Sequence, residues 1–360
     1  MTMQQTATPA APVTGVTTHA SMKRQEAIAG LSFMTPAMIV LIVFLILPMF
    51  VAGYFSLTDW NGSRPLSQTD AYEMVGLENY QNLLIDGRRM EDFYGALRNT
   101  IYYVMGVVPI QTMLALVLAV VVNQRWLRGR GFFRTAYYFP SISSSIVVSF
   151  IFLFMFSKTG PVNGLLHSVV PGWEDMAFLQ NNDGLLHQIL GWDRIRDAPG
   201  WVRTDVLGLN IYDWLSGPSV AMFTIMLLAI WTTTGTMMVI YLAALQNIPG
   251  NVYEAAQVDG ANAWQTFRYI IAPLLRPTTF FVVTLGLIGT FQVFDQVYVL
   301  QDTTTAETTT SSAYLVYYFA FERSPTEMGT ASAAALILFA IIFVATILQR
   351  VLVGGDKAED

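Results

Sequence analysis

The sequence predicts an all-α integral membrane protein with six transmembrane helices. Of the 360 residues, 54% are hydrophobic and only 12% are charged, about half the charged share of a typical soluble domain. Several runs contain no charged residue, and each is close to or longer than the roughly 20 residues that a helix needs to cross the hydrocarbon core. Cysteine is absent and the three histidines never stand at ligand spacing. No disulfide framework or metal site is therefore expected, and the net charge of −6 gives no reason to expect nucleic acid.

The charge-free runs place the six spans. These runs cover 27–58, 99–124, 135–157, 214–253, 277–294 and 328–349. We expect the helices at about 28–57, 98–122, 135–157, 217–245, 276–300 and 329–350. The run 214–253 accommodates one span and an interfacial shoulder, because a second span would need a hairpin near Thr232–Thr236, where no polar turn could close it.

The termini are expected to be short tails around one transmembrane domain, 25–353. Residues 1–24 begin with a Thr-, Ala- and Pro-rich stretch that predicts disorder. This stretch does not resemble a signal peptide, since the basic pair Lys23–Arg24 follows it and the next apolar run is too long. Residues 354–360 form the C-terminal tail.

Charge predicts which side each loop faces. Six spans put both termini on one side, which then carries ten of the 19 basic residues but only six of the 25 acidic ones. The loop "NQRWLRGRGFFR" (123–134) places four arginines close to span ends. Because basic residues near spans favour the cytoplasm, we expect both termini and the polar segment 249–275 to be cytoplasmic.

Three loops are then extracytoplasmic: 59–97, 158–213 and 302–327. The loop 158–213 contains "GLLH" twice, at 164–167 and 184–187, each followed by Gly-Trp. Either a small duplication forms two amphipathic helices on the membrane surface, or the repeat is chance. The Thr-rich loop 302–327 is expected to be irregular.

The chain has no energy source of its own. A phosphate-binding Walker loop needs Gly-Lys followed by Ser or Thr, and none of the three lysines follows a glycine. The only ionisable residue well inside a predicted span is Asp295, whereas proton-driven carriers bury several. The protein is therefore passive, or a cytoplasmic partner supplies the energy.

The segment 249–275 carries the signals of two short helices. Asn251 with Glu254, and then Asn262 with Gln265, are each spaced as in a capping box. Gly260 is suited to ending the first helix in a left-handed turn. Pro273 and Pro277 are expected to mark the bend into the next span.

An apolar face on this segment needs a covering surface. Tyr253, Ala256, Gly260, Trp264 and Phe267 recur at steps of three and four residues. Two interpretations fit: the face binds another protein, which the small residues would let approach closely, or the helix lies flat on the lipid.

The stretch "EAAQVDGANAWQTFRYIIAP" resembles the cytoplasmic EAA loop of binding-protein-dependent ABC importer permeases. The matching residues are Glu254, Ala255, Ala256, Gly260, Ile270 and Pro273. Ala272 stands where the family usually has leucine. Similarity to sugar-importer permeases of the first-subunit type continues in "VGLENYQNLL" (75–84), "ALRNT" (96–100), "LRGRGFFRTAYYFP" (127–140), "IYLAALQNIP" (240–249) and "FQVFDQVYVL" (291–300).

This resemblance implies a non-catalytic permease subunit in a bacterial or archaeal plasma membrane. It implies pairing with a second homologous permease, two ATPase subunits that bind ATP and Mg, and an extracytoplasmic binding protein that delivers a carbohydrate. Residues 251–264 would be the coupling helix, with Glu254 and Gly260 central and Asp259 beside them. The family's usual Gly-Gly-Pro loop after "YVL" is replaced here by "QDTTTAETTTSS", and the loop 158–213 is longer than the family's. Both departures lie on the side expected to receive the binding protein.

Two groups of residues are candidates for the solute path. Phe291, Asp295 and Tyr298 are spaced to share one helical face, where aromatic rings could stack on sugar rings; alternatively, Asp295 sits in the last outer turn and is simply hydrated. Trp231 and Gly235 share a face of the fourth span, where small residues more often serve helix packing. No Lys or Arg lies inside a span, which favours a neutral sugar over the alternatives, a glycerol phosphate or a polyol. A channel that works without an ATPase would not need the EAA segment.

Overall fold

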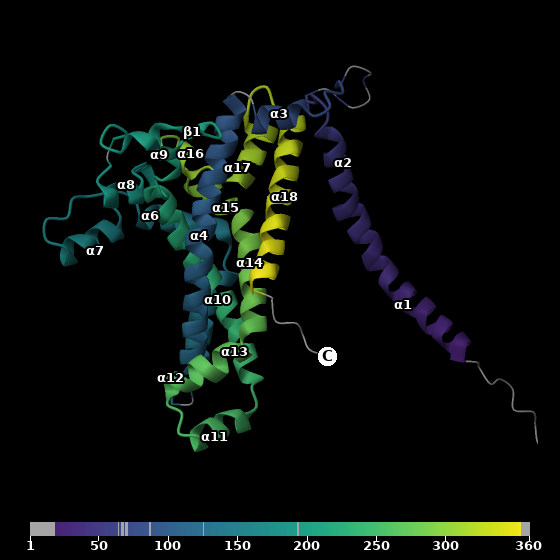
Figure 1. Ribbon diagram of the computed structural model, residues 1–360, viewed down its shortest axis with the longest axis vertical. Coiled ribbons are helices and arrows are strands. Elements are labelled where there is room, and N and C mark those ends of the chain that lie inside the picture. The colour runs from purple at the N-terminus through teal and green to yellow at the C-terminus, as the bar shows by residue number, and fades with distance from the viewer. Residues whose placement is uncertain are drawn as a thin grey trace, which may run out of the picture. The chain divides into compact units, whose positions relative to one another are not determined.

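The computed structural model describes residues 19–63, 65, 68, 71–85, 88–124, 126–192 and 194–353. The predicted C-terminal tail and most of the predicted N-terminal tail lie outside the described residues. The chain divides into two compact units, Met1–Tyr54 and Phe55–Asp360, and each is described by itself (Figure 1).

The first unit is a single apolar helical rod. It consists of α1 (His19–Leu41), the π-helical segment η1 (Ile42–Ile46) and α2 (Leu47–Phe55). The part Glu26–Phe55 is long and apolar enough to cross a membrane, and none of its most apolar window is buried. A helix that is apolar all round is suited to lipid, and this one covers the predicted first span at 28–57 except for its last two residues.

The second unit is built around four long helices. These are α4 (Arg88–Asn123), α10 (Val220–Gln246), α14 (Arg276–Phe291) and α18 (Met328–Val353). Four helices of the described chain are long and apolar enough to span a membrane without a break: one in the first unit, and α4, α10 and α18 in the second. The number rises to six if each of two bent pairs, one of which includes α14, counts as one span. The six-span count remains a prediction.

The segment predicted as the third span is not one straight helix. Helices α5 (Arg130–Ile142) and α6 (Ser145–Met155) meet at an angle of 96°. The chain leaves helical geometry at Ser143, whose φ of −72° and ψ of 150° are extended, shortly after Pro140. Charge-free composition marked the segment as apolar but carried no information about this bend.

Helices α4 and α10 form the centre of the unit. Tyr103 and Val107 of α4 pack with Met222 and Ile225 of α10 in one buried cluster. Farther along the same pair, Ala115 and Ala119 pack with Tyr241 and Leu242.

Polar side chains also join the long helices. Thr233 of α10 donates to the Gln111 side chain of α4 at 2.5 Å, and Thr284 of α14 donates to the Gln349 side chain of α18 at 3.0 Å. Such hydrogen bonds join helices in a medium that offers no other polar partner.

Short elements cover both ends of the bundle (Figure 1). One end, here called the α11 end, carries α11 (Gly250–Val258), α12 (Ala263–Thr266), η4 (Phe267–Ile271) and α13 (Ala272–Leu274). The opposite end, here called the loop end, carries β1 (Asp205–Val206), β2 (Leu209–Asn210), α9 (Ile211–Trp214) and α16 (Ala306–Thr309). The remaining short elements are α3 (Glu78–Leu84), α7 (Pro161–Val169), η2 (Phe178–Gln180), α8 (Leu185–Leu190), η3 (Gly200–Arg203), α15 (Asp295–Leu300), α17 (Ser312–Tyr317) and η5 (Tyr318–Glu322).

Two loops are more ordered than the sequence suggested. The Thr-rich segment 302–327 was expected to be irregular, which is wrong: it contains α16, α17 and η5. Its hydroxyls satisfy the local backbone, as Thr309 donates to the Thr305 carbonyl and Ser311 caps α17 by accepting from Tyr314 N–H. The β1–β2 hairpin is the only strand pair in the described residues, closed by Leu207 and Gly208 at positive φ.

Candidate functional site: an exposed helical element and a polar cavity

The element at the α11 end folds through local caps, and one of the two predicted N-caps is wrong. Helix α11 begins at Gly250 after Pro249, and no side chain caps it. Asn251 therefore lies inside the helix, because Pro249 already holds the extended backbone of an N-cap, with φ −60° and ψ 142°. The second cap is confirmed: Asn262 and Gln265 form a reciprocal capping box with two 2.8 Å bonds.

Gly260 ends α11 as predicted. Its φ is +72°, the left-handed region in which glycine is least strained. The N–H of Ala261 donates to the Ala256 carbonyl at 2.9 Å, and the N–H of Gly260 donates to the Gln257 carbonyl at 3.1 Å. This pair is a Schellman motif, and it turns the chain sharply between α11 and α12.

The residues of the EAA pattern divide between exposed and partly buried positions. Glu254, Ala255, Asp259 and Gly260 are exposed, whereas Ala256 is buried. Ile270 and Pro273 are partly buried.

The apolar residues that α11, α12 and η4 expose differ from the predicted face. They are Val258 (88% exposed), Trp264 (68%) and Tyr269 (72%). Because α11 and α12 are separate helices, the predicted three- and four-residue steps do not continue across Gly260. Trp264 belongs to both sets; Val258 and Tyr269 were missed, although each stands one or two residues from a residue that was singled out.

The element is anchored to the bundle at its C-terminal end. Leu275 is buried, and Ile271 packs on the same cluster, which includes Leu245 and Tyr241 of α10. The segments Ala263–Leu274 and Arg276–Phe291 meet at 66°, so the bend predicted from Pro273 and Pro277 is present. A displacement of α11 and α12 would therefore act on α10 and α14 through this joint.

The predicted aromatic and acidic face of the fifth span does not exist as one continuous face. Helix α14 ends at Phe291, and α15 begins at Asp295 after a break. Phe291 is buried among Val104, Val108 and Leu338, whereas Asp295 and Tyr298 are exposed. The hydrophobic run marked neither the break nor the separation of these side chains.

Gly235 lies where two helices cross. A Cβ at this position would overlap the Tyr137 carbonyl oxygen of α5 and come within 2.6 Å of the Ser141 hydroxyl. The residue therefore lets α5 approach α10 closely, which is the packing interpretation. Trp231, one turn earlier, is 49% exposed and its ring lies 5.8 Å from that of Phe152.

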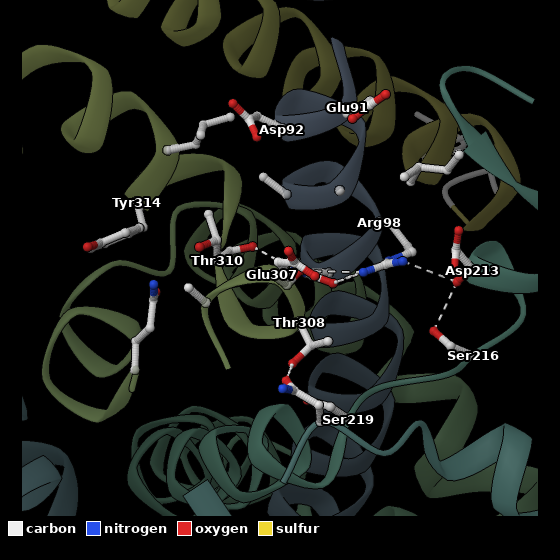
Figure 2. A pocket seen from close by; sticks show the side chains of 18 of the residues that line it. Glu91, Asp92, Arg98, Asp213, Ser216, Ser219, Glu307, Thr308, Thr310 and Tyr314 are labelled. Atoms are coloured by element: carbon white, nitrogen blue, oxygen red, sulfur yellow. Dashed lines mark hydrogen bonds between the residues drawn. The ribbon is translucent and has the colours of Figure 1, made fainter. Parts of the chain in front are cut away.

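A polar cavity of about 850 Å³ opens at the loop end, and the sequence did not predict it (Figure 2). Its walls come from the start of α4, the segment 182–219, and α15 to η5. Most of the polar side chains in the lining are carboxylates, amides and phenols, joined by one guanidinium and one imidazole. They include Glu91, Asp92, Arg98, Asn99, Asn182, His187, Tyr212, Asp213, Tyr298, Gln301, Asp302, Glu307, Tyr314, Tyr318 and Glu322.

Among the described residues that line the cavity, Arg98 is the only Lys or Arg side chain, and neutral acceptors hold it. Its guanidinium donates to the Asp213 carbonyl at 3.3 Å, the Glu307 carbonyl at 3.5 Å and the Asn99 side chain at 3.1 Å. Figure 2 shows Arg98 between Glu307 and Asp213. Asn99, buried beside it, donates to the carbonyls of Glu307 and Thr310 at 2.9 and 3.0 Å. These bonds tie α4 to the segments that form two cavity walls.

A second set of hydrogen bonds joins the segment between α7 and α10 to the segment that contains α16. The Asn182 side chain donates to the Thr304 carbonyl at 2.5 Å and accepts from the Thr308 hydroxyl at 2.6 Å. The Thr304 N–H donates to Asp302 at 2.9 Å, and this hydrogen bond is the main cause that lowers the pKa of Asp302. Asp302 therefore remains charged near neutral pH.

Aromatic rings form one side of the cavity. Tyr298 and Tyr314 lie 6.3 Å apart between ring centroids, and Phe294 stacks on Tyr298 at 5.4 Å. The Tyr314 hydroxyl donates to Glu322 at 2.7 Å. The arrangement offers flat apolar faces beside carboxylates, the combination suited to pyranose rings and their hydroxyls.

The two "GLLH" segments are not structurally equivalent. Gly164 lies inside α7, whereas Gly184 precedes α8 as its N-cap. His167 is exposed and pairs with Asp175 at 2.8 Å. His187 is buried, stacks on Tyr212 at 3.9 Å between ring centroids and donates to the Tyr212 carbonyl at 2.9 Å. Burial lowers the pKa of His187 and raises that of Asp213, which Arg98 partly offsets.

Several cavity residues come from stretches whose sequence does not mark them as a site. "ALRNT", which resembles the family, supplies Arg98 and Asn99. The run "QDTTTAETTTSS", which departs from the family's pattern, supplies Asp302 and Glu307. No local signal joins these stretches, because they meet only in the folded chain. Among the described residues, no group of three or more His, Cys, Asp or Glu side chains is arranged to hold a metal ion.

Comparison with known proteins shows the family of this chain over most of its length. Residues 93–355 match the family described as "Binding-protein-dependent transport system inner membrane component". The chain is 30% identical over 337 residues to the lactose transport system permease protein LacF of Rhizobium radiobacter, covering 92% of this chain and 95% of that protein. It is 31% identical to the arabinooligosaccharides transport system permease protein AraP of Halalkalibacterium halodurans, covering 79% and 77%.

A solved structure shares the fold. It is a bacterial ABC transporter involved in the import of the acidic polysaccharide alginate, with a TM-score of 0.66 at 22% identity over 92% of this chain and 97% of that one. The protein is a multi-pass membrane subunit of a transporter and not an enzyme. The chain belongs to the family of inner membrane components of binding-protein-dependent transport systems.

Proposed function

We propose that this protein is the translocation subunit of an ATP-driven importer that brings a carbohydrate, a mono- or oligosaccharide, into the cytoplasm. The family establishes the transport role, and relatives that carry lactose and arabinooligosaccharide permease names favour sugars. The observation that carries the substrate class is the cavity at the loop end. Its amides, carboxylates and tyrosine faces match the hydroxyls and apolar ring faces of a saccharide.

The α11 end is proposed as the docking site for the energy source. Val258 and Glu254 of α11 and Trp264 of α12 are all exposed on this short element. Apolar side chains displayed in this way need a partner surface, and the chain itself has no Gly-Lys phosphate loop. Two ATPase subunits would bind ATP and Mg. One would engage the α11 element of this chain, and the other would engage the corresponding element of a second homologous permease.

This assignment fixes the orientation. The α11 end faces the cytoplasm of a bacterial or archaeal cell together with both termini, and the loop end faces outward, where an extracytoplasmic binding protein would deliver the sugar. A structural neighbour was solved with an alginate pentasaccharide-bound periplasmic protein, which supports such delivery. The charge-rich arginine loop 123–134 is then cytoplasmic, as the positive-inside rule requires.

Three alternatives are less favoured. A glycerol phosphate would need a cation in its path, but Arg98 is engaged by neutral acceptors and the rest of the cavity is acidic. A polyol would lack the ring faces that Tyr298 and Tyr314 could stack against. A channel independent of an ATPase would leave the exposed α11 element without a role.

Uptake by the reconstituted complex tests the proposal. The permeases and ATPases are placed in proteoliposomes with the binding protein, and entry of labelled sugar is followed with and without ATP. Uptake should require ATP, and Glu254→Lys or Gly260→Asp should abolish it while the protein remains in the membrane. Glu26→Lys, a charge reversal of an exposed residue outside the α11 element and outside the loop end, is the control and should transport normally. Normal uptake in both α11 variants would refute the coupling role.

A further inference from the structure

The cavity at the loop end is strongly acidic. Six carboxylates line it: Glu91, Asp92, Asp213, Asp302, Glu307 and Glu322. Arg98 is the single Lys or Arg side chain among the lining residues that the structure describes, and His187 adds no charge near neutral pH because burial lowers its pKa. The lining therefore carries a clear excess of negative charge.

The guanidinium of Arg98 is not available to an anionic ligand. Its donors already reach the carbonyls of Asp213 and Glu307 and the Asn99 side chain. To bind a substrate carboxylate, Arg98 would have to abandon bonds that join three segments of the wall. Four of the carboxylates, by contrast, are exposed: Glu91, Asp92, Glu307 and Glu322.

A cleft lined by one sign of charge concentrates ions of the opposite sign and repels ions of the same sign, by about tenfold or more. We propose that this cavity selects saccharides by charge: it admits neutral sugars and cationic amino sugars and rejects uronates. The proposal rests on the proposed sugar-import function. It separates this chain from the structural neighbour, which imports an acidic polysaccharide.

The absence of cysteine from the chain allows a test that does not depend on the sugar. Gly95 lies on α4, lines the cavity and has no atom within 4 Å of an added Cβ. Gly164 in α7 is likewise open and is not among the lining residues. Gly95→Cys and Gly164→Cys are thus a matched pair, each a single thiol in the full chain within the assembled complex.

The thiols are reacted with two methanethiosulfonates of similar size, one carrying trimethylammonium and one carrying sulfonate, and modification of this chain is followed by mass. The ratio of cationic to anionic rates should be about tenfold higher at Gly95→Cys than at Gly164→Cys. It should collapse at about 1 M salt, where the screening length is about 3 Å. Equal ratios at the two positions would overturn the proposal.

Charge variants locate the effect. Adding Glu91→Gln or Glu307→Gln to Gly95→Cys should each lower the ratio about threefold, as expected for one charge a few ångströms away in a wet site. Glu174→Gln, which neutralises an exposed carboxylate outside the cavity, should not change it. A ratio unaffected by both cavity variants would refute the assignment of the selectivity to these carboxylates.

Uptake then ties charge to transport. Maltotriose, the glucosamine trimer and trigalacturonate are offered at equal concentration to the reconstituted complex. The first two should enter at least about tenfold faster than trigalacturonate, and faster entry of trigalacturonate would overturn the proposal. If no sugar enters with ATP, the proposed import function fails, while the thiol ratios still decide whether the cavity selects by charge.

Discussion

Gly235 of α10 lies directly against the Tyr137 carbonyl oxygen of α5, so that no side chain fits between the two helices. This contact holds α5 across α10 beside the 96° bend into α6. A residue that sequence inspection placed near the solute path is thus the point where two helix backbones meet.

Replacing Gly235 by alanine should destabilise the protein. The new methyl group would overlap a backbone atom, which cannot rotate away, and overpacking of this kind costs about 1–3 kcal/mol. The melting temperature in detergent should fall clearly. Gly289→Ala in α14 is the control, because nothing lies within 4 Å of its added Cβ; equal melting temperatures for the two variants would contradict the packing role.

Asn99→Ala should loosen the cavity wall. Asn99 is buried and its amide bonds both the Glu307 and the Thr310 carbonyls. Without this amide the Thr310 carbonyl loses its Asn99 donor and the Glu307 carbonyl keeps only the 3.5 Å bond from Arg98. Removing a buried donor in this way costs about 1–3 kcal/mol. Melting temperature and sugar uptake should both fall, and Asn99→Asp, which also lacks the donors, should not restore them. Asn61→Ala, at an exposed turn, should change neither more than marginally.

The exposed apolar residues at the α11 end should matter for coupling and not for folding. Val258→Asp and Trp264→Ala remove apolar surface that is mostly exposed in this chain, where the Trp264 ring contacts only its near neighbour Phe267 among the described rings, so the melting temperature should change little. Recovery of the ATPase with the tagged permease, and ATP-dependent uptake, should drop severalfold. Leu165→Asp on exposed α7 is a matched control; a similar loss there would point to a general effect of surface charge.

Tyr298 should contribute to sugar affinity through its ring. It is 48% exposed and lines the cavity beside Tyr314. Loss of one stacking face costs about 1 kcal/mol, so Tyr298→Ala should raise the KM for uptake about fivefold. Tyr298→Phe retains the ring and should stay near the wild-type value. An unchanged KM in the alanine variant would remove Tyr298 from the path.

Stability should decrease with acidification through His187. Its pKa in the folded protein is lowered from the usual 6.5 by burial. Below about pH 6.5 the unfolded chain binds a proton that the folded chain does not, so stability is constant above this pH and is lost as pH falls below it. The melting temperature should fall more between pH 7.5 and 5.5 for the wild type than for His187→Gln, which cannot titrate; parallel curves would contradict this.

Local signals account for the parts that the sequence predicted. The capping box at Asn262 and Gln265 and the left-handed turn at Gly260 depend on a few adjacent residues, and both are present. The cap at Asn251 failed because Pro249, two residues earlier, starts the helix sooner. The spacing of Glu254, Gly260 and Pro273 was enough to suggest the family.

The sequence by itself determined the membrane class, the apolar segments and the capped element at 249–275, because hydropathy and caps act over one helix or one turn. Only the tertiary structure decided where apolar segments break, as at Ser143 and between Phe291 and Asp295. It also decided that Arg98, Asp213 and Glu307 share one cavity. Arg98 lies more than one hundred positions before Asp213 in the sequence. The hydrogen bonds that join these segments exist only after the helices have packed.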